Sequence, residues 1–177
     1  QEWKNNYYNE WGNIMNAFKN FQCIVVWVPF NEAWGQFDTP AVVKFTRELD
    51  PTRLVNPASG GNFDFSCGAE GYGDIIDVHH YPCPAMNFFD RKFVNVLGEY
   101  GGIGLPVEGH TWNIDRKWGY GGTKKDSEEV MTIYEQYLDM LKVFVSTGCA
   151  AAVYTQTTDV EGEVNGLMTY DRKVIKV

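Results

Sequence analysis

The sequence predicts an α/β fold built on a parallel sheet, and three observations lead to this prediction. Apolar runs rich in β-branched residues, such as 24–28, are typical of strands buried on both faces. Segments with apolar residues every three or four positions separate these runs, which is the pattern of amphipathic helices. The chain has 177 residues, 44% of them hydrophobic, enough for one domain with a core. Strands that alternate with helices require right-handed crossovers and therefore a parallel sheet.

The first half of the chain contains two predicted helices and two predicted strands. Apolar residues between 3 and 21 form one helical stripe, and a strand at 24–29 follows directly. Thr39 is the expected N-cap of the next helix, with Pro40 in its first turn. A short strand at 54–56 comes after this helix.

The second half continues the alternation. Its predicted elements are a strand at 74–79, a short helix at 87–93, a strand at 94–98, a helix from about 126 to 148 and a strand at 150–155. Asp126 and Glu129 have the spacing of a capping box, and Gly148 is a typical C-terminal stop. A glycine-rich, aromatic loop runs from 100 to about 125, and loops of that length inside a compact domain usually carry function.

Five strands cannot close an eight-stranded (β/α) barrel. The chain is therefore predicted to be either an open α/β sheet or the later part of a barrel whose first three strands lie elsewhere. A half-barrel would expose a parallel edge and apolar sheet faces, which natural proteins avoid. We expect residues 1–177, without an internal boundary, to belong to a larger enzyme or to complete their barrel through another chain.

Composition excludes some classes of partner. The formal charge is −8 and no Lys/Arg cluster is present, whereas nucleic acids and anionic membrane surfaces require a basic footprint. No apolar run approaches the ~20 residues of a membrane-spanning helix. Aromatic residues make up 15%, many of them in loop-like stretches such as Trp34, Phe63 and Trp118. Either they fill an irregular surface, or they stack on the apolar faces of sugar rings.

The four cysteines, Cys23, Cys67, Cys83 and Cys149, have no spacing typical of a zinc site or a disulfide framework. We expect free and mostly buried thiols.

Two glutamates follow predicted strands directly. Glu32 comes after Asn31 at the exit of the 24–29 strand, and Glu99 follows the 94–98 strand. In (β/α) barrels the carboxyl ends of the strands gather the catalytic residues on one face. Either glutamate alone would be interpreted as a solvated loop carboxylate, but the matching pair indicates an active site.

Four stretches resemble glycoside hydrolase family 2, the family of β-galactosidases, β-glucuronidases and β-mannosidases, in its catalytic TIM barrel. They appear in the family's order and are VVWVPFNE at 25–32, LDPTRLVN at 49–56, VLGEYGG at 96–102, and YTQTTDVE at 154–161 with NGL at 165–167. The resemblance implies a partial (β/α)8 barrel comprising strands 4 to 8 with their helices. It also implies that the missing strands and β-sandwich domains are partners within a parent protein.

The resemblance implies a retaining glycosidase that cleaves terminal β-glycosidic bonds of β-galactoside or β-glucuronide type. Glu99 corresponds to the nucleophile and Glu32 to the acid/base, whose carboxyl groups must lie ~5–5.5 Å apart across the bond. The two residues are 67 positions apart, consistent with three intervening βα units. Two alternatives stay open: a non-catalytic carbohydrate-binding or scaffold fragment, and a glycosidase of another family with the same barrel.

Further residues have predicted roles in substrate binding. By resemblance, Asn31 would bind the sugar 2-hydroxyl, and Tyr154 takes a position where relatives often carry a stacking Trp. Tyr81 could donate its hydroxyl to Glu99, His80 could contact substrate, and Trp112 could line the pocket rim.

No metal and no cofactor are expected. His79 and His80 are adjacent, so on a regular strand they point to opposite faces and cannot share a metal. An acidic run, Asp159, Glu161 and Glu163, favours a solvated face or salt bridges to Arg172 and Lys173 over a cation site. The sequence leaves open which sugar is cleaved, the oligomeric state, and whether the compartment is periplasmic, extracellular or cytoplasmic.

Overall fold

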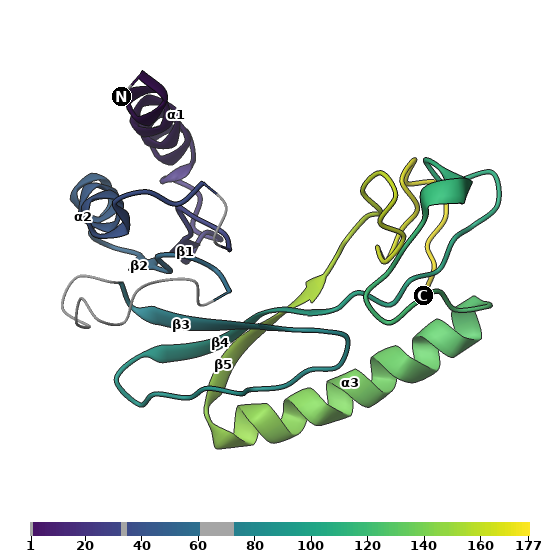
Figure 1. Ribbon diagram of the computed structural model, residues 1–177. Helices are drawn as coiled ribbons and strands as arrows, with labels where there is room; N and C mark the ends of the chain where they lie inside the picture. Colours follow the sequence, from purple (N-terminus) through teal and green to yellow (C-terminus); the bar gives the residue numbers. More distant parts are fainter. Residues whose placement is uncertain (1, 33–34, 61–72) are drawn as a thin grey trace. The chain divides into compact units, whose positions relative to one another are not determined.

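The computed structural model describes residues 2–32, 35–60 and 73–177, so Trp34, Phe63 and Cys67 lie outside the described residues (Figure 1). Close contacts divide the chain into two compact units. The first comprises 1–77 and 90–94, and the second comprises 78–89 and 95–177. Strands β3 (Ile75–His80) and β4 (Val94–Gly101) each contribute residues to both units. The prediction of a single domain without an internal boundary stays a prediction.

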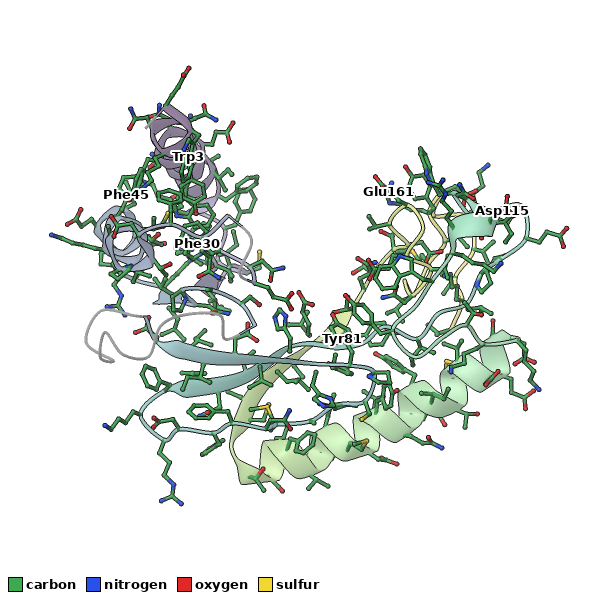
Figure 2. All side chains as sticks on the ribbon, viewed as in Figure 1. Trp3, Phe30, Phe45, Tyr81, Asp115 and Glu161 are labelled. Carbon is green, nitrogen blue, oxygen red and sulfur yellow. The ribbon has the colours of Figure 1, made fainter. Side chains whose placement is uncertain are left out.

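The first unit contains helices α1 (Glu2–Phe18) and α2 (Thr39–Leu49) and the short strands β1 (Val26–Trp27) and β2 (Leu54–Val55). The two strands pair in parallel, as the sequence predicts. Aromatic side chains fill the space between the helices and the exit of β1, where Tyr7 stacks on Phe30 with ring centroids 5.2 Å apart (Figure 2). Asp38 caps α2 in place of the predicted Thr39, with a left-handed φ of 40° and no side-chain cap bond.

Burial in the first unit is more one-sided than predicted. On α1 the buried residue is Met15, whereas Ile14 and Phe18 of the predicted stripe are 45% and 47% exposed. On β1 Trp27 is buried, but the flanking Val25 and Val28 are exposed, so the prediction of a strand buried on both faces is wrong for this structure. Trp27 is covered because Trp11 and Asp50 contact its side chain, whereas Val25, two positions earlier on the same face, is 67% exposed.

The second unit is built on β3, β4 and β5 (Cys149–Thr155), hydrogen-bonded in the order β3-β4-β5. Strands β4 and β5 are parallel. Helix α3 (Ser127–Thr147) lies along this sheet and buries Val130 and Tyr137 against Leu97 and Tyr100 of β4 (Figure 1). The predicted start and stop signals of α3 are confirmed. The Asp126 carboxylate caps the N-terminus by accepting from the Glu129 amide, and Gly148 ends the helix in the left-handed conformation.

The predicted short helix at 87–93 is wrong. The segment is irregular and ends in a turn, in which the Asp90 carboxylate accepts from the Lys92 amide and the Asp90 carbonyl accepts from the Phe93 amide. An Asp side chain that bonds to the backbone two residues on offers the chain an alternative to helical hydrogen bonds.

A buried ion pair that was not predicted from the sequence lies in the C-terminal segment, residues 157–177. Lys176 Nζ lies 2.6 Å from Asp159 Oδ1, both side chains are 1% exposed, and Lys176 also donates to the Val164 carbonyl. The expected partners of the acidic run, Arg172 and Lys173, do not form this pair. Burial raises the pKa of Asp159 against the opposing effect of Lys176, and burial lowers the pKa of Lys176.

The described cysteines are free, as predicted, but Cys23 is exposed rather than buried. Among the described helices, none combines the length and apolarity needed to cross a bilayer. Among the residues that the structure describes, the order of five strands among helices agrees with the α/β fold predicted from the sequence.

Candidate active site

Glu99 lies near the carboxyl end of β4, at a bulge in the pairing of β4 with β5. Leu97 pairs with Ala152 and Tyr100 with Tyr154, so Gly98 and Glu99 together oppose one residue of β5. A bulge re-aims the side chain at that position and is frequent beside active sites. The predicted strand end is therefore a bulge within a longer strand, since β4 continues to Gly101.

A chain of hydrogen bonds supports the Glu99 carboxylate. The Tyr81 hydroxyl donates to Glu99 Oε2 at 2.5 Å, and the oxygens of Tyr81 and Thr155 lie 2.7 Å apart. A phenol has one proton, so the Thr155 hydroxyl is the donor in the second bond. Burial, followed by the bond to Glu99, raises the pKa of Tyr81, which keeps the phenol protonated as a donor. Thr155 belongs to β5, so two strands and the exit of β3 hold one carboxylate in place.

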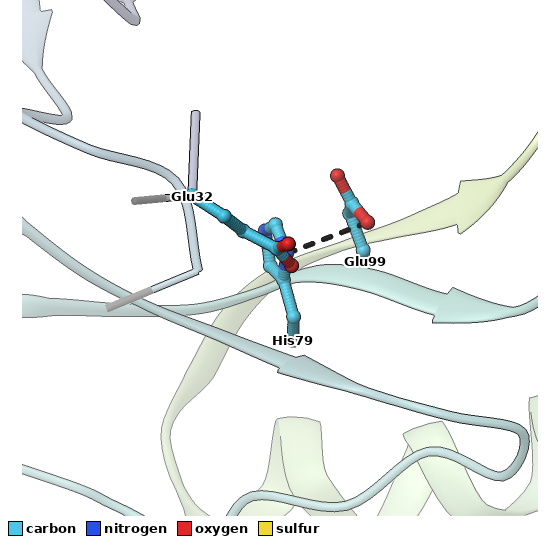
Figure 3. A group of neighbouring side chains, drawn as sticks. All are labelled: Glu32, His79 and Glu99. Atoms are coloured by element: carbon cyan, nitrogen blue, oxygen red, sulfur yellow. Dashed lines mark ion pairs between the residues drawn. The ribbon is translucent and has the colours of Figure 1, made fainter. Parts of the chain in front are cut away.

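The two adjacent histidines have different partners, as the alternation along a strand predicts. His79 Nδ1 lies 3.4 Å from Glu99 Oε2, with the His79 side chain 6% exposed (Figure 3). His80 Nδ1 lies 2.7 Å from the Cys83 carbonyl, so it carries the proton of that bond. A substrate contact by His80 stays a prediction, and the structure brings the neighbouring His79 to Glu99. The missed signal is strand parity, because His79 and Tyr81 are two positions apart and share a face.

Asn31 and Glu32 follow β1 in the first unit. The exit of the strand is fixed by Tyr7, which donates to the Pro29 carbonyl at 2.6 Å, and by Ser59, whose amide donates to the Phe30 carbonyl. Asn31 is exposed and its carbonyl accepts from Gln36, while Glu32 is half-buried. Glu32 and Glu99 thus belong to different units, and their convergence on one substrate stays a prediction.

Tyr154 and Trp112 have surroundings that the sequence did not reveal. The Tyr154 ring packs edge-on against Tyr100 and Tyr134, and its hydroxyl accepts from the Ile103 amide. Burial raises the pKa of Tyr154 to about 12. Trp112 is 59% exposed, packs against Tyr170, and lines a cavity of about 460 Å³ in the long loop. Their roles toward substrate stay predictions.

Glu163 and Asn165 are near this network and were not predicted as site residues. Asn165 is fully buried, and its amide donates to the Thr155 carbonyl and to Glu163 Oε1, each at 3.1 Å. Burial raises the pKa of Glu163, the Asn165 bond opposes this rise, and the negative charges of Glu99 and Asp159 add to it. The chain of contacts from Asn165 through Thr155 and Tyr81 to Glu99 could not be found by spacing, because it joins residues up to 84 positions apart in the sequence (Tyr81 and Asn165).

The arrangement around Glu99 has the elements of an activated carboxylate. The hydrogen bond from Tyr81 and the contact with His79 both fall on Oε2 of Glu99, and the Glu99 side chain is 25% exposed. A carboxylate that accepts a hydrogen bond from a phenol on one oxygen and is partly open to solvent can attack an electrophilic carbon or accept a proton.

Comparison with a model of known protein families identifies part of the chain. Residues 1–76 match "Glycosyl hydrolases family 2, TIM barrel domain". The resemblance to glycoside hydrolase family 2 predicted from the sequence is thereby confirmed. No curated protein matches the chain.

Solved structures show the same fold. The chain aligns with an FMN-binding β-glucuronidase from Facaelibacterium prausnitzii L2-6 at a TM-score of 0.63 and 20% identity, over 97% of this chain and 30% of that one. A β-D-glucuronidase from Dictyoglomus thermophilum gives 0.62 and 18%, over 94% and 32%. A putative β-galactosidase from Bacteroides fragilis gives 0.63 and 15%, over 97% and 29%. The chain spans about a third of the length of these proteins, and its fold is that of a partial TIM barrel.

Proposed function

We propose that this chain supplies both catalytic carboxylates of a retaining glycosidase that cleaves terminal β-glycosidic bonds. Glu99 is the nucleophile, and Glu32 is the acid in the first step and the base in the second. The observation that carries the proposal is the Tyr81–Glu99 hydrogen bond at a bulged strand end, because it orients one carboxylate oxygen and leaves the side chain partly exposed. The match of residues 1–76 to a family 2 TIM barrel supports it.

In the first step, Glu99 attacks the anomeric carbon while Glu32 protonates the leaving oxygen. The bond from carbon to the leaving group breaks, and a covalent glycosyl-enzyme ester forms. In the second step, Glu32 takes a proton from water, the water oxygen attacks the same carbon, and Glu99 is released as a carboxylate. Asn31, next to the acid, would hydrogen-bond the sugar 2-hydroxyl, a contact that strengthens in the transition state.

The test uses the full-length protein with aryl β-galactosides, β-glucuronides and β-mannosides. Glu32→Gln should lower kcat/KM by about 10²- to 10⁴-fold, the usual contribution of a general acid. Glu99→Gln should reduce aglycone release to background, because no covalent ester can form. Glu135→Gln makes the same chemical change on an exposed position of α3 and should keep wild-type activity.

Mass spectrometry after trapping with a 2-fluoro glycoside identifies the nucleophile directly. A label on the peptide containing Glu99 supports the assignment, and a label on any other residue overturns it. Sugar binding without release of the aglycone by the wild-type protein would favour the carbohydrate-binding alternative instead.

A further inference from the structure

Two exposed aromatic residues, Tyr120 and Trp118, lie next to Tyr81, the residue that donates to Glu99. The Tyr120 ring stacks on the Tyr81 ring at a centroid distance of 3.6 Å and an angle of 8°. Trp118 meets Tyr120 edge-on at 5.1 Å. Tyr120 is 42% exposed and Trp118 is 46% exposed. The three rings form a continuous row, the aromatic row, that begins at the phenol bound to Glu99 and ends at the surface of the second unit.

The backbone fixes both outer rings. The Trp118 amide donates to the Gly162 carbonyl and the Trp118 carbonyl accepts from Val164, both at 2.9 Å, while the Tyr120 amide donates to the Gly102 carbonyl at 3.1 Å. A Cβ atom on Gly102 would lie 2.4 Å from the Tyr120 ring, and its φ of +66° also favours glycine. The exposed rings are thus held against the end of β4 before any ligand binds, which lowers the entropy lost on binding.

The position of the row indicates which part of a substrate it can reach. In an enzyme that removes a terminal sugar, that sugar lies over the nucleophile, and the leaving group points away from it toward solvent. The aromatic row leads from Glu99 to the surface in this way. Glu163, whose backbone forms a bridge with Trp118, adds a half-buried carboxyl beside the row, which disfavours an anionic leaving group.

We infer that Trp118 and Tyr120 form a binding site for the leaving group of the substrate, selective for an uncharged aromatic ring or an uncharged sugar ring. Such rings offer a flat or apolar face to a tyrosine or tryptophan side chain. This inference rests on the proposed function and adds to it the chemical class of the leaving group.

The test separates leaving-group binding from bond cleavage. The full-length protein is trapped as its 2-fluoroglycosyl ester on Glu99, and its return to activity is followed in water and with increasing phenyl β-glucoside as acceptor. An acceptor that occupies the leaving-group site takes the sugar from Glu99 and accelerates this return. Trp118→Leu should lower the acceptor-dependent rate by about 3- to 10-fold, the worth of one aromatic contact, and leave the rate in water unchanged. Tyr120→Leu also removes the ring stacked on Tyr81, so its acceptor-dependent rate is divided by its own rate in water, and this ratio should fall by the same factor.

Matched variants make the outcome unambiguous. Tyr120→Phe keeps the ring and should retain the acceptor effect, and Trp3→Leu removes an exposed tryptophan from α1 and should change neither rate. Equal acceptor-dependent rates in wild type, Tyr120→Leu and Trp118→Leu would overturn the inference. So would a loss of thermal stability in both leucine variants with an unchanged acceptor effect, because another part of the protein would then cover the row. Failure of the wild-type protein to form the ester at all would instead refute the proposed function.

Discussion

The two units each hold a carboxylate in place, but by different arrangements. Asp50 in the first unit is 5% exposed and has donors on both oxygens: the Thr52 amide and hydroxyl on Oδ1, and the Trp27 indole and Arg53 on Oδ2. Glu99 in the second unit is 25% exposed, and its contacts with Tyr81 and His79 both fall on Oε2. A buried carboxylate with donors on both oxygens, such as Asp50, stabilises the fold, whereas Glu99, oriented through a single oxygen, can still react.

Replacing the two carboxylates should separate catalysis from stability. Glu99→Gln is isosteric and keeps a side-chain oxygen that can accept from Tyr81, so aglycone release should fall to background while the free energy of unfolding changes by no more than about 1.5 kcal/mol. Urea unfolding of the full-length protein, followed by tryptophan fluorescence, measures the free energy of unfolding. A large loss of stability in this variant would contradict the distinction between Asp50 and Glu99, because Glu99 would then also be a structural carboxylate.

Asp50→Ala should have the opposite result. It leaves the Arg53 charge and the Trp27 indole without their partner in a buried setting, so the free energy of unfolding should fall by about 3 kcal/mol. Calorimetry of the full-length protein checks this value. Asp139→Ala is the control, since the Asp139–Lys142 ion pair is about three-quarters exposed and should contribute less than about 1 kcal/mol. Equal losses in the two variants would contradict the structural role of Asp50.

Asp50 also predicts a pH dependence. The Thr52 hydroxyl, followed by the Trp27 indole and the other donors, holds the pKa of Asp50 well below its ordinary value of 3.8. A carboxyl with a lowered folded-state pKa contributes stability above its unfolded value and loses it as the pH falls toward the folded value. Stability should therefore decline below about pH 4, and the decline should be shallower in Asp50→Asn. Parallel curves for the two proteins between pH 2 and 5 would exclude Asp50 as a cause.

Tyr81→Phe removes the donor to Glu99 and tests whether this hydrogen bond contributes to catalysis. A hydrogen bond to a charged group contributes about 1.5–3 kcal/mol, so kcat/KM should fall about 10- to 100-fold. The ring stack with Tyr120 is retained, which keeps the fold. Steady-state kinetics with an aryl glycoside is the measurement, and an unchanged kcat/KM would show that the phenol is only packed there.

Thr155→Val should have the smallest effect. Thr155 donates to Tyr81 and acts on Glu99 only through it, so the loss in kcat/KM should be about 5-fold, near 1 kcal/mol. Thr155→Ser keeps the hydroxyl and should restore most of the rate. If the serine and valine variants are equally slow, the methyl packing of Thr155 matters rather than its hydrogen bond.

The order of helices and strands could be predicted from the sequence, because the signals for these elements are local. Hydrophobic periodicity placed the helices and strands, Asp126 and Gly148 marked the ends of α3, and two strands led to Glu32 and Glu99. The stretches that resemble glycoside hydrolase family 2 also occur in the family's order along the chain. Local signals failed at 87–93, where the Asp90 side chain competes for the backbone, and at 24–29, where burial depends on what covers the strand.

Which side chains contact one another depends on the three-dimensional packing of the strands and could not be predicted from local signals. The choice of His79 over His80, the bulge at Gly98 and Glu99, and the approach of Thr155 all depend on how β4 pairs with β5 and where β3 ends. The Asp159–Lys176 pair likewise joins residues that no periodicity connects. Because the direction of a strand side chain reverses with every residue, one inserted residue changes which side chains share a face of the sheet.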